Sequence, residues 1–336
     1  MNHEKRPFFD VRRCLNELKS NCKQVFVSSP IEVACFSRLS ASQYIPCSRQ
    51  VLRSFRPPPV PSCLKEGCES FIPKDQNSSI SLTPVRESLE KASVKLDDSI
   101  QFLTFRNNLN KIALTPYHTD KGWKIASHLE NHWIVLNICP SEESEPVTDK
   151  DKYFAYCGYK FEQLCTESDD FVDANQEFCS ILKTTIGQHT LLVSAQVDCW
   201  DAYHLWSQDD QPEYPIGHYV ELKTMKKRKK SEAIPCPYQK YLRYWVQCFL
   251  AGIPHLFIGY RDDRREMLVE TEYIPVGRLP EMCRDSWDPQ ICLGFMDSFL
   301  YFVSSMHRAF PSRMIVWEYQ PTTQKIWINY KSHPNE

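Results

Sequence analysis

The sequence predicts a single α/β domain built around a mixed β-sheet. The chain has 336 residues, of which 42% are apolar, so it is long enough to bury a large core. Segments with strand-like and helix-like patterns alternate along the chain, and no stretch of sequence repeats. Charged residues make up 24% of the chain and nearly cancel, giving a formal net charge of -2. This composition is typical of a soluble globular protein, in which any nucleic-acid site must be a local patch.

The individual elements are predicted from the period of the apolar residues and from the turn residues that separate them. Helices are expected over residues 85–96, 153–165, 175–185, 239–250 and 288–307. Strands are expected over residues 123–126, 133–138, 191–199, 218–224, 256–261, 314–319 and 325–330. This alternation of the two element types indicates a mixed α/β sheet.

Residues 1–100 are expected to form an irregular arm that wraps around the domain. The proline-rich stretch at 56–61 favours an extended, polyproline-like conformation, and residues 76–81 are polar with little periodicity. Residues 101–336 are denser in apolar and aromatic side chains and are expected to form the α/β core. The arm and the core are expected to make one structural domain.

The spacing of the glycines excludes several classes of nucleotide-binding enzyme. The chain has nine glycines, and the closest two, Gly252 and Gly259, are seven positions apart. P-loops, dinucleotide-binding fingerprints and nucleophile elbows all need glycines that lie closer together. A glycine-rich loop that cradles phosphate is therefore not expected.

The cysteines and the amino end indicate an intracellular protein. There are 15 cysteines and no C-x-x-C pair, and Cys35 lies among apolar residues, as expected for reduced thiols. Residues 1–10 are charged and lack the apolar stretch of a signal peptide. The longest apolar stretch, residues 248–260, contains Pro254 and is too short to span a bilayer, so no membrane segment is expected.

The strongest functional signal is a set of charged residues on two predicted strands. Strand alternation places Gln196 and Asp198 on one face of the first strand, and Glu221 and Lys223 on one face of the second. If the two strands are neighbours, two carboxylates and an ammonium converge. Metal-dependent nucleases use such an arrangement, because carboxylates bind Mg²⁺ or Mn²⁺ and a lysine stabilises charge developing on phosphorus. The alternative is an exposed charge pair on one strand.

Two helices and one loop add weaker signals. Glu162 lies in the predicted helix over 153–165, and Arg243 and Gln247 lie along one stripe of the helix over 239–250. Each helix alone is typical of an ordinary amphipathic element. The basic run at 225–230 follows the second strand; it predicts an RNA contact or a nuclear import signal, or else a solvated loop.

Taken together, these motifs resemble those of the DXO-type decapping exonucleases. The resemblance rests on Gly-Tyr-Lys-Phe-Glu at 158–162, Gln-Val-Asp at 196–198, Glu-Leu-Lys at 221–223 and Trp-Val-Gln at 245–247. It continues through Phe-Arg at 105–106, Phe-Cys-Ser at 178–180 and Gly-Tyr-Arg-Asp at 259–262, and so covers about residues 100–300 in order. It implies two packed mixed sheets flanked by helices, and an enzyme that removes incomplete caps, NAD or pyrophosphate from RNA 5′ ends and degrades RNA 5′ to 3′.

The same resemblance implies a role for each motif residue. Glu162, Asp198 and Glu221 would bind Mg²⁺ or Mn²⁺, assisted by the main-chain carbonyl of Leu222. Lys223 and Gln247 would act in catalysis by holding the scissile phosphate or its nucleophile. The residues expected to contact the RNA are Phe105, Arg106, Asn107, Cys179, Gln196, Lys223 and Gln247.

Two positions depart from the family pattern. The family has Glu-Val-Asp where this chain has Gln196-Val197-Asp198, and it commonly has glycine where this chain has Asn107. An amide oxygen can still coordinate a cation weakly, but it carries no charge for a second divalent ion. The rival hypothesis is therefore an RNA-binding adaptor that has lost turnover, and a DNA nuclease is a third class. If the protein is a weakened enzyme, Gln196→Glu is expected to raise its activity.

The expected partners follow from the predicted chemistry. The substrate is the 5′ end of RNA, and a 5′–3′ exoribonuclease is the expected protein partner. No membrane partner is expected. The protein is expected in the nucleus, and also in the cytoplasm.

Overall fold

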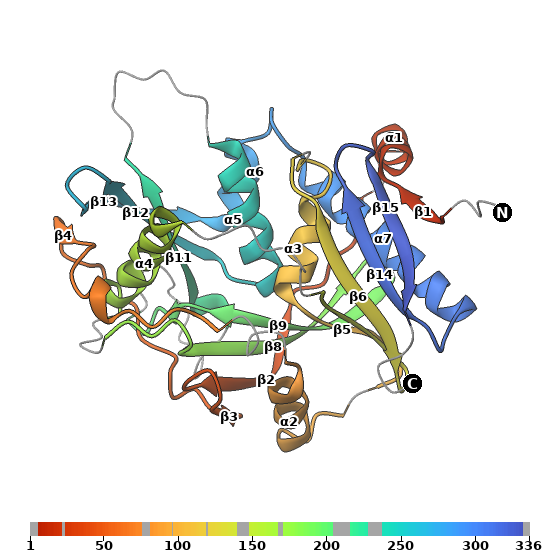
Figure 1. Ribbon diagram of the computed structural model, residues 1–336, viewed down its shortest axis with the longest axis horizontal. Coiled ribbons are helices and arrows are strands. Elements are labelled where there is room, and N and C mark those ends of the chain that lie inside the picture. Colours follow the sequence, from red (N-terminus) through yellow and green to blue (C-terminus); the bar gives the residue numbers. More distant parts are fainter. Residues whose placement is uncertain are drawn as a thin grey trace.

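Two mixed β-sheets organise the computed structural model, which describes residues 6–21, 24–75, 81–95, 97–118, 120–139, 148–166, 171–203, 216–227 and 237–331 (Figure 1). Within these residues the larger sheet has ten strands, in the spatial order β1 (Phe8–Asp10), β15 (Lys325–Lys331), β14 (Met314–Gln320), β6 (Trp123–Glu130), β7 (Trp133–Ile138), β5 (Ile100–Phe105), β9 (His189–Val197), β8 (Glu177–Ile186), β2 (Ile31–Arg38) and β3 (Tyr44–Pro46). The smaller sheet has five described strands, in the order β10 (Cys199–Trp200), β11 (Tyr219–Lys226), β12 (His255–Asp262), β13 (Met267–Pro275) and β4 (Ser62–Cys63).

Both sheets contain parallel and antiparallel pairs. In the larger sheet β5 runs parallel to β7 and β9, and in the smaller sheet β11 runs parallel to β12; the other described pairs are antiparallel. This confirms the prediction of an α/β domain with two packed mixed sheets.

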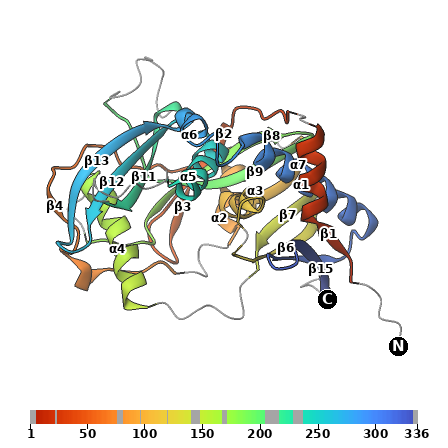
Figure 2. The ribbon, with the colours of Figure 1, turned by 90° about the horizontal axis from the view of Figure 1, so that it is seen from above.

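Helices cover the faces of the larger sheet unequally (Figures 1 and 2). One face carries α1, α3, α5 and α7, and the opposite face carries α2, while α4 packs against β11 of the smaller sheet. The helices are α1 (Val11–Asn21), α2 (Thr83–Lys91), α3 (Arg106–Leu114), α4 (Asp149–Leu164), α5 (Tyr238–Ala251), α6 (Leu279–Met282) and α7 (Pro289–Ala309).

The main core lies between the larger sheet and its helical layer. Phe295, Phe299 and Val303 follow one face of α7 at helical spacing and are fully buried. The ring of Phe299 packs edge-on against Trp317 of β14, with the ring centroids 5.5 Å apart. Among the described residues, no helix is both long enough and apolar enough to cross a membrane.

The prediction of a helix over 175–185 is wrong, because this segment forms strand β8. β8 pairs with β2 on one side and with β9 on the other, so nearly all of its side chains are buried on both faces. A strand that is buried on both faces has a continuous apolar run instead of alternation, and such a run does not distinguish a strand from a buried helix. The run Thr184-Thr185-Ile186 is β-branched and was the available signal for a strand.

The prediction that residues 1–100 are irregular is also wrong. This segment supplies α1, α2 and strands to both sheets: β1 pairs with β15, β2 with β8, and β4 with β13. Apart from β2, the strands are only two or three residues long, too short to show a period. The N-terminal segment therefore completes the edges of both sheets.

Candidate active site

Two neighbouring cavities are lined by residues of β8 and β9 of the larger sheet, and the larger cavity is also lined by residues of α3 and α5. The larger has a volume of about 630 Å³ and the smaller about 70 Å³. Glu177 of β8 and Gln196 of β9 line both cavities, so they form the wall that the two spaces share. Glu162 and Asp198 line the smaller cavity.

Asp198 lies where the chain passes from one sheet to the other. β9 ends at Val197 in the larger sheet, and Cys199 begins β10, which pairs with β11 in the smaller sheet. The Asp198 carboxylate accepts a 2.8 Å hydrogen bond from the main-chain N–H of Leu222 in β11. β9 and β11 are thus not adjacent strands of one sheet, and the crossing at Asp198 is what brings the two predicted motifs together.

The ammonium of Lys223 lies among three of the predicted metal ligands. It forms an ion pair with Glu221, donates a 3.1 Å hydrogen bond to the Leu222 carbonyl and lies 3.9 Å from Asp198 Oδ2. Within the described part of the chain, no three Asp, Glu, His or Cys side chains are close enough to form a metal site as they stand. Asp198, Glu221 and the Leu222 carbonyl thus surround the Lys223 ammonium, and the prediction that Glu162, Asp198 and Glu221 bind one metal ion stays a prediction.

Glu221 is fully buried and has three cationic or amide donors. Besides Lys223, the Gln247 amide donates to Glu221 Oε1, and Arg106 lies 3.3 Å from Oε2. Arg106 also donates a 3.3 Å hydrogen bond to the main-chain carbonyl of Gln247, and this bond links α3 to α5. Burial alone would raise the pKa of Glu221, but Lys223 and Arg106 outweigh it and hold the pKa below its usual value.

Glu162 is positioned by a close contact between α4 and β12. The preceding residue, Phe161, is fully buried and stacks on Phe257 of β12 with the ring centroids 6.1 Å apart. Gly259 makes room for this ring, because a Cβ atom there would lie 2.5 Å from the Phe161 ring. The position of Glu162 therefore depends on a glycine in another element.

The other two carboxylates lack the donors that Glu221 has. Burial and the neighbouring Asp198 raise the pKa of Glu162 well above its usual range. Burial and Glu221 raise the pKa of Asp198 to about 6, although Lys223 opposes this shift. Ionised forms that repel each other in a buried site are stabilised by an added cation, and oxygen ligands are those that Mg²⁺ and Mn²⁺ prefer. The donor chemistry of Glu162, Asp198, Glu221 and the Leu222 carbonyl fits a divalent cation.

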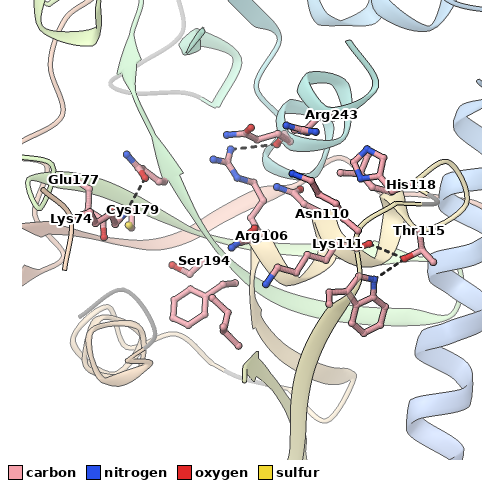
Figure 3. A pocket seen from close by; sticks show the side chains of 18 of the residues that line it. Lys74, Arg106, Asn110, Lys111, Thr115, His118, Glu177, Cys179, Ser194 and Arg243 are labelled. Carbon is pink, nitrogen blue, oxygen red and sulfur yellow. Dashed lines mark hydrogen bonds and ion pairs between the residues drawn. The ribbon is translucent and has the colours of Figure 1, made fainter. Parts of the chain in front are cut away.

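The larger cavity is strongly basic. Figure 3 shows Lys74, Glu177 and Cys179 at one end, His118 and Thr115 at the other, and Arg106 and Lys111 between them. Among the described residues that line it, Glu177 is the one acidic side chain, and it is ion-paired to Arg38 and Lys74. The basic residues that line the cavity are Arg38, Lys74, Arg106, Lys111, Lys121 and Arg243.

Comparison with known proteins identifies the family. Residues 28–334 match the family model described as RAI1 like PD-(D/E)XK nuclease. The human decapping and exoribonuclease protein is 30% identical over 309 residues, covering 83% of this chain and 76% of that protein. The decapping nuclease RAI1 of Aspergillus fumigatus is 28% identical over 310 residues, covering 83% of this chain and 82% of that protein. The crystal structure of S. pombe Rai1 in complex with 3′-FADP has a TM-score of 0.79 and 26% identity, covering 97% and 99% of the two chains.

The chain belongs to the RAI1-like PD-(D/E)XK nuclease family. It is therefore a hydrolase of the nuclease class, as the sequence predicted. The residue types in the family name, an acidic residue and an acidic-x-Lys sequence, occur in this chain as Asp198 and Glu221-Leu222-Lys223, and the structure brings these residues together. A fold of this family typically works with a divalent metal, in agreement with the donor chemistry of the site.

Most of the predicted substrate residues line the basic cavity of this RAI1-like nuclease. They are Phe105, Arg106, Asn107, Cys179, Gln196 and Gln247, whereas Lys223 lies behind them among the carboxylates. Cys179 is buried, and burial raises the pKa of its thiol well above the usual value, so it contributes shape rather than charge.

Several residues of the cavity were missed at the sequence level. Lys111 and Asn110 lie one helical turn after Asn107 and Arg106 on α3, a spacing of four that was available as a signal. Burial lowers the pKa of Lys111, and no described carboxylate lies within ion-pairing distance of its ammonium. The buried Oδ1 of Asn110 has no hydrogen-bond partner among the described residues. Lys111 and Asn110 are therefore available to a phosphate or a nucleotide in the cavity.

Proposed function

We propose that this protein hydrolyses phosphodiester or pyrophosphate bonds at the 5′ end of RNA with Mg²⁺ or Mn²⁺ as its cofactor. The targets would be non-canonical caps, NAD or pyrophosphate, followed by degradation of the RNA from 5′ to 3′. The observation that carries this proposal is that Gln196 and Glu177 line both the basic cavity and the smaller cavity that contains Glu162 and Asp198. A polyanion bound in the larger cavity would extend along this shared wall towards Glu162 and Asp198.

The residues divide the chemistry between them. Glu162, Asp198 and Glu221 with the Leu222 carbonyl would hold the metal, which when bound generates a hydroxide and polarises the phosphate. Lys223 would stabilise the charge that develops on phosphorus, because its ammonium already lies within 3.9 Å of Asp198. Gln247 fixes Glu221 by a hydrogen bond and reaches the large cavity.

The basic cavity supplies the binding of the RNA strand. Arg38, Lys111 and Arg243 would neutralise successive phosphates, and this kind of binding weakens as salt increases. Phe36 and Phe105 line the same cavity and offer ring faces for stacking of unpaired bases. The S. pombe Rai1 relative was crystallised with 3′-FADP, a nucleotide ligand, which supports a nucleotide-binding role for this cavity.

The test is an assay with 5′-end-labelled RNAs that carry a triphosphate, an unmethylated cap or NAD, with and without Mg²⁺ or Mn²⁺. We expect metal-dependent release of a labelled product from at least one of these ends. Glu318→Gln, which changes a carboxylate of β14 outside the site, serves as the control and should retain activity. No metal-dependent product from any RNA would contradict the proposal. A 5′-labelled DNA in the same assay tests the DNA-nuclease alternative.

The second candidate function is an RNA-binding adaptor without turnover, and Gln196 is the observation that favours it. Its side-chain oxygen lies 3.4 Å from Lys74 Nζ, so the position that is acidic in the family is neutral and next to a cation here. RNA binding in the absence of any metal-dependent product would support the adaptor.

Two further expectations concern the cellular setting. Hydrolysis of the modified 5′ ends leaves a 5′-monophosphate RNA, the class of substrate that a 5′–3′ exoribonuclease consumes, and we propose such an enzyme as the partner. A nuclear location would follow if the basic run at 225–230 is an import signal; positions 228–230 of this run lie outside the described residues. Co-purification of an exoribonuclease and imaging of a variant with a neutral run test these two proposals.

A further inference from the structure

The side of the site next to Gln196 is occupied by a lysine from the N-terminal segment. Lys74 Nζ lies 2.5 Å from Glu177 Oε2 and 3.4 Å from Gln196 Oε1. The backbone around Lys74 is held by Asn175, which accepts a 2.8 Å hydrogen bond from the Asp75 N–H and donates a 3.1 Å hydrogen bond to the Pro73 carbonyl. Lys74 is therefore a fixed component of the site and not a mobile surface side chain.

Glu177 anchors this lysine and has no free oxygen to offer a metal. Its Oε2 pairs with Lys74 and its Oε1 lies 3.0 Å from Arg38 Nε, in a pair whose side chains are each 5% exposed. On this side of the site one carboxylate thus faces two cations, and the remaining ligand, Gln196, is a neutral amide. A divalent ion is held most strongly by anionic oxygens, and among the described residues this side of the site supplies none that is unpaired.

Lys74 is charged and acts on the metal-site carboxylates. A lysine ordinarily carries its positive charge at neutral pH, and Lys74 is ion-paired with Glu177, so its ammonium faces Gln196. Glu162 lines the same small cavity as Glu177 and Gln196, the two residues that the Lys74 ammonium contacts. The positive charge of Lys74 therefore reaches the carboxylates opposite Gln196.

We propose that the Lys74 ammonium takes the place of a second divalent cation, so that this protein works with one metal ion, held by Glu162, Asp198 and Glu221. The inference rests on the proposed function, because it concerns the number of metal ions that the hydrolase uses. It adds Lys74 as a residue of the reaction site: its charge would neutralise the phosphate on the Gln196 side, where a metal ion would otherwise be needed.

A consequence is that Gln196→Glu by itself should not create a second metal site. The new carboxylate would lie next to the Lys74 ammonium and form an ion pair with it. Only the double variant Gln196→Glu/Lys74→Met would leave an unpaired carboxylate beside Glu162. On this proposal, Gln196→Glu alone should not raise the activity, and a gain in activity requires both changes.

The test is the number of Mn²⁺ ions bound per chain, measured by calorimetric titration and by electron paramagnetic resonance of free Mn²⁺ at about pH 7.5, where carboxylates are ordinarily ionised. We expect one ion for the natural chain, one for Gln196→Glu and two for the double variant. Lys124→Met, which changes a lysine of β6 outside the site, is the matched control and should bind one ion.

Any other number of bound ions contradicts either the one-metal inference or the proposed function. Two ions bound to the natural chain would overturn the one-metal inference and leave the proposed hydrolase intact. Two ions bound to Gln196→Glu alone would show that Lys74 does not fill the second position. No bound ion in the natural chain would contradict the proposed metal-dependent function itself. If the double variant fails to fold, the counts for the natural chain and for Gln196→Glu still decide the question.

Discussion

At the residue scale, the three carboxylates of the site have different surroundings, and these surroundings shift their pKa values in opposite directions. Glu221 is ion-paired with Lys223 and Arg106 and accepts a hydrogen bond from Gln247, and its pKa is lowered. Burial instead raises the pKa values of Glu162 and Asp198. The motif residues could be predicted from the sequence because strand alternation places them on shared faces. The position of the Lys223 ammonium beside Asp198 could not be predicted, because it depends on the chain passing from one sheet to the other at Asp198.

The raised pKa of Asp198 predicts how stability changes with pH. The unfolded chain releases this proton near pH 3.8 and the folded protein near about 6, so the metal-free protein should lose stability as the pH rises between these values. Asp198→Asn removes this loss, and above about pH 6 it should stabilise the metal-free protein by roughly 1–3 kcal/mol relative to the natural chain. Thermal unfolding in EDTA at several pH values measures the difference. A natural chain that is the more stable of the two at pH 7.5 would contradict this prediction.

At the element scale, most of the longer strands were predicted, but β8 was not, and neither were β2, β5 and β13. β11 was found from its alternation, while β8 was mistaken for a helix because its side chains are buried on both faces. Short edge strands such as β1 and β4 carry no period at all. Their pairing is decided by the strands beside them and not by their own sequence.

The contact between α4 and β12 predicts a strong effect of Gly259→Ala. The added Cβ would lie 2.5 Å from the Phe161 ring and 2.8 Å from Leu268, so α4 must shift and carry Glu162 with it. Overpacking of this kind costs about 1–3 kcal/mol, and the shift should also weaken Mn²⁺ binding. Gly277→Ala is the matched control, because an added Cβ there meets nothing within 4 Å.

Denaturant unfolding and Mn²⁺ titration of the two alanine variants test this prediction. Gly277→Ala should match the natural chain in both measurements. Unchanged metal affinity in a destabilised Gly259→Ala would show that Glu162 does not depend on this contact.

At the scale of the whole molecule, a polar network joins the two sheets beneath the site. Glu32 of β2 in the larger sheet accepts a 2.8 Å hydrogen bond from the hydroxyl of Tyr219 in β11 of the smaller sheet. Arg49, from the N-terminal segment, forms an ion pair with Glu32 and donates a 2.8 Å hydrogen bond to the same hydroxyl. No sequence pattern could reveal this network, because its residues are brought together only by the packing of the two sheets.

Loss of Arg49 should therefore destabilise the protein and loosen the site. Arg49→Met leaves the largely buried Glu32 without its cation, at a cost of about 1–3 kcal/mol in the free energy of unfolding. Arg13→Met is the control: its partner Glu17 is exposed, and the free energy of unfolding should not change. Equal stability of the two variants in denaturant titrations would show that the network does not hold the sheets together.

The proposed function requires that the carboxylate site hydrolyses RNA, and one measurement tests this most directly. It is the initial rate of product release from a 5′-triphosphate, capped or NAD-bearing RNA, compared between the natural chain and Asp198→Asn with Mg²⁺ or Mn²⁺ present. We expect metal-dependent product from the natural chain and a loss of at least about 10²-fold in Asp198→Asn, which should remain folded. Equal rates in the two proteins, or no metal-dependent product from the natural chain, would contradict the proposed function.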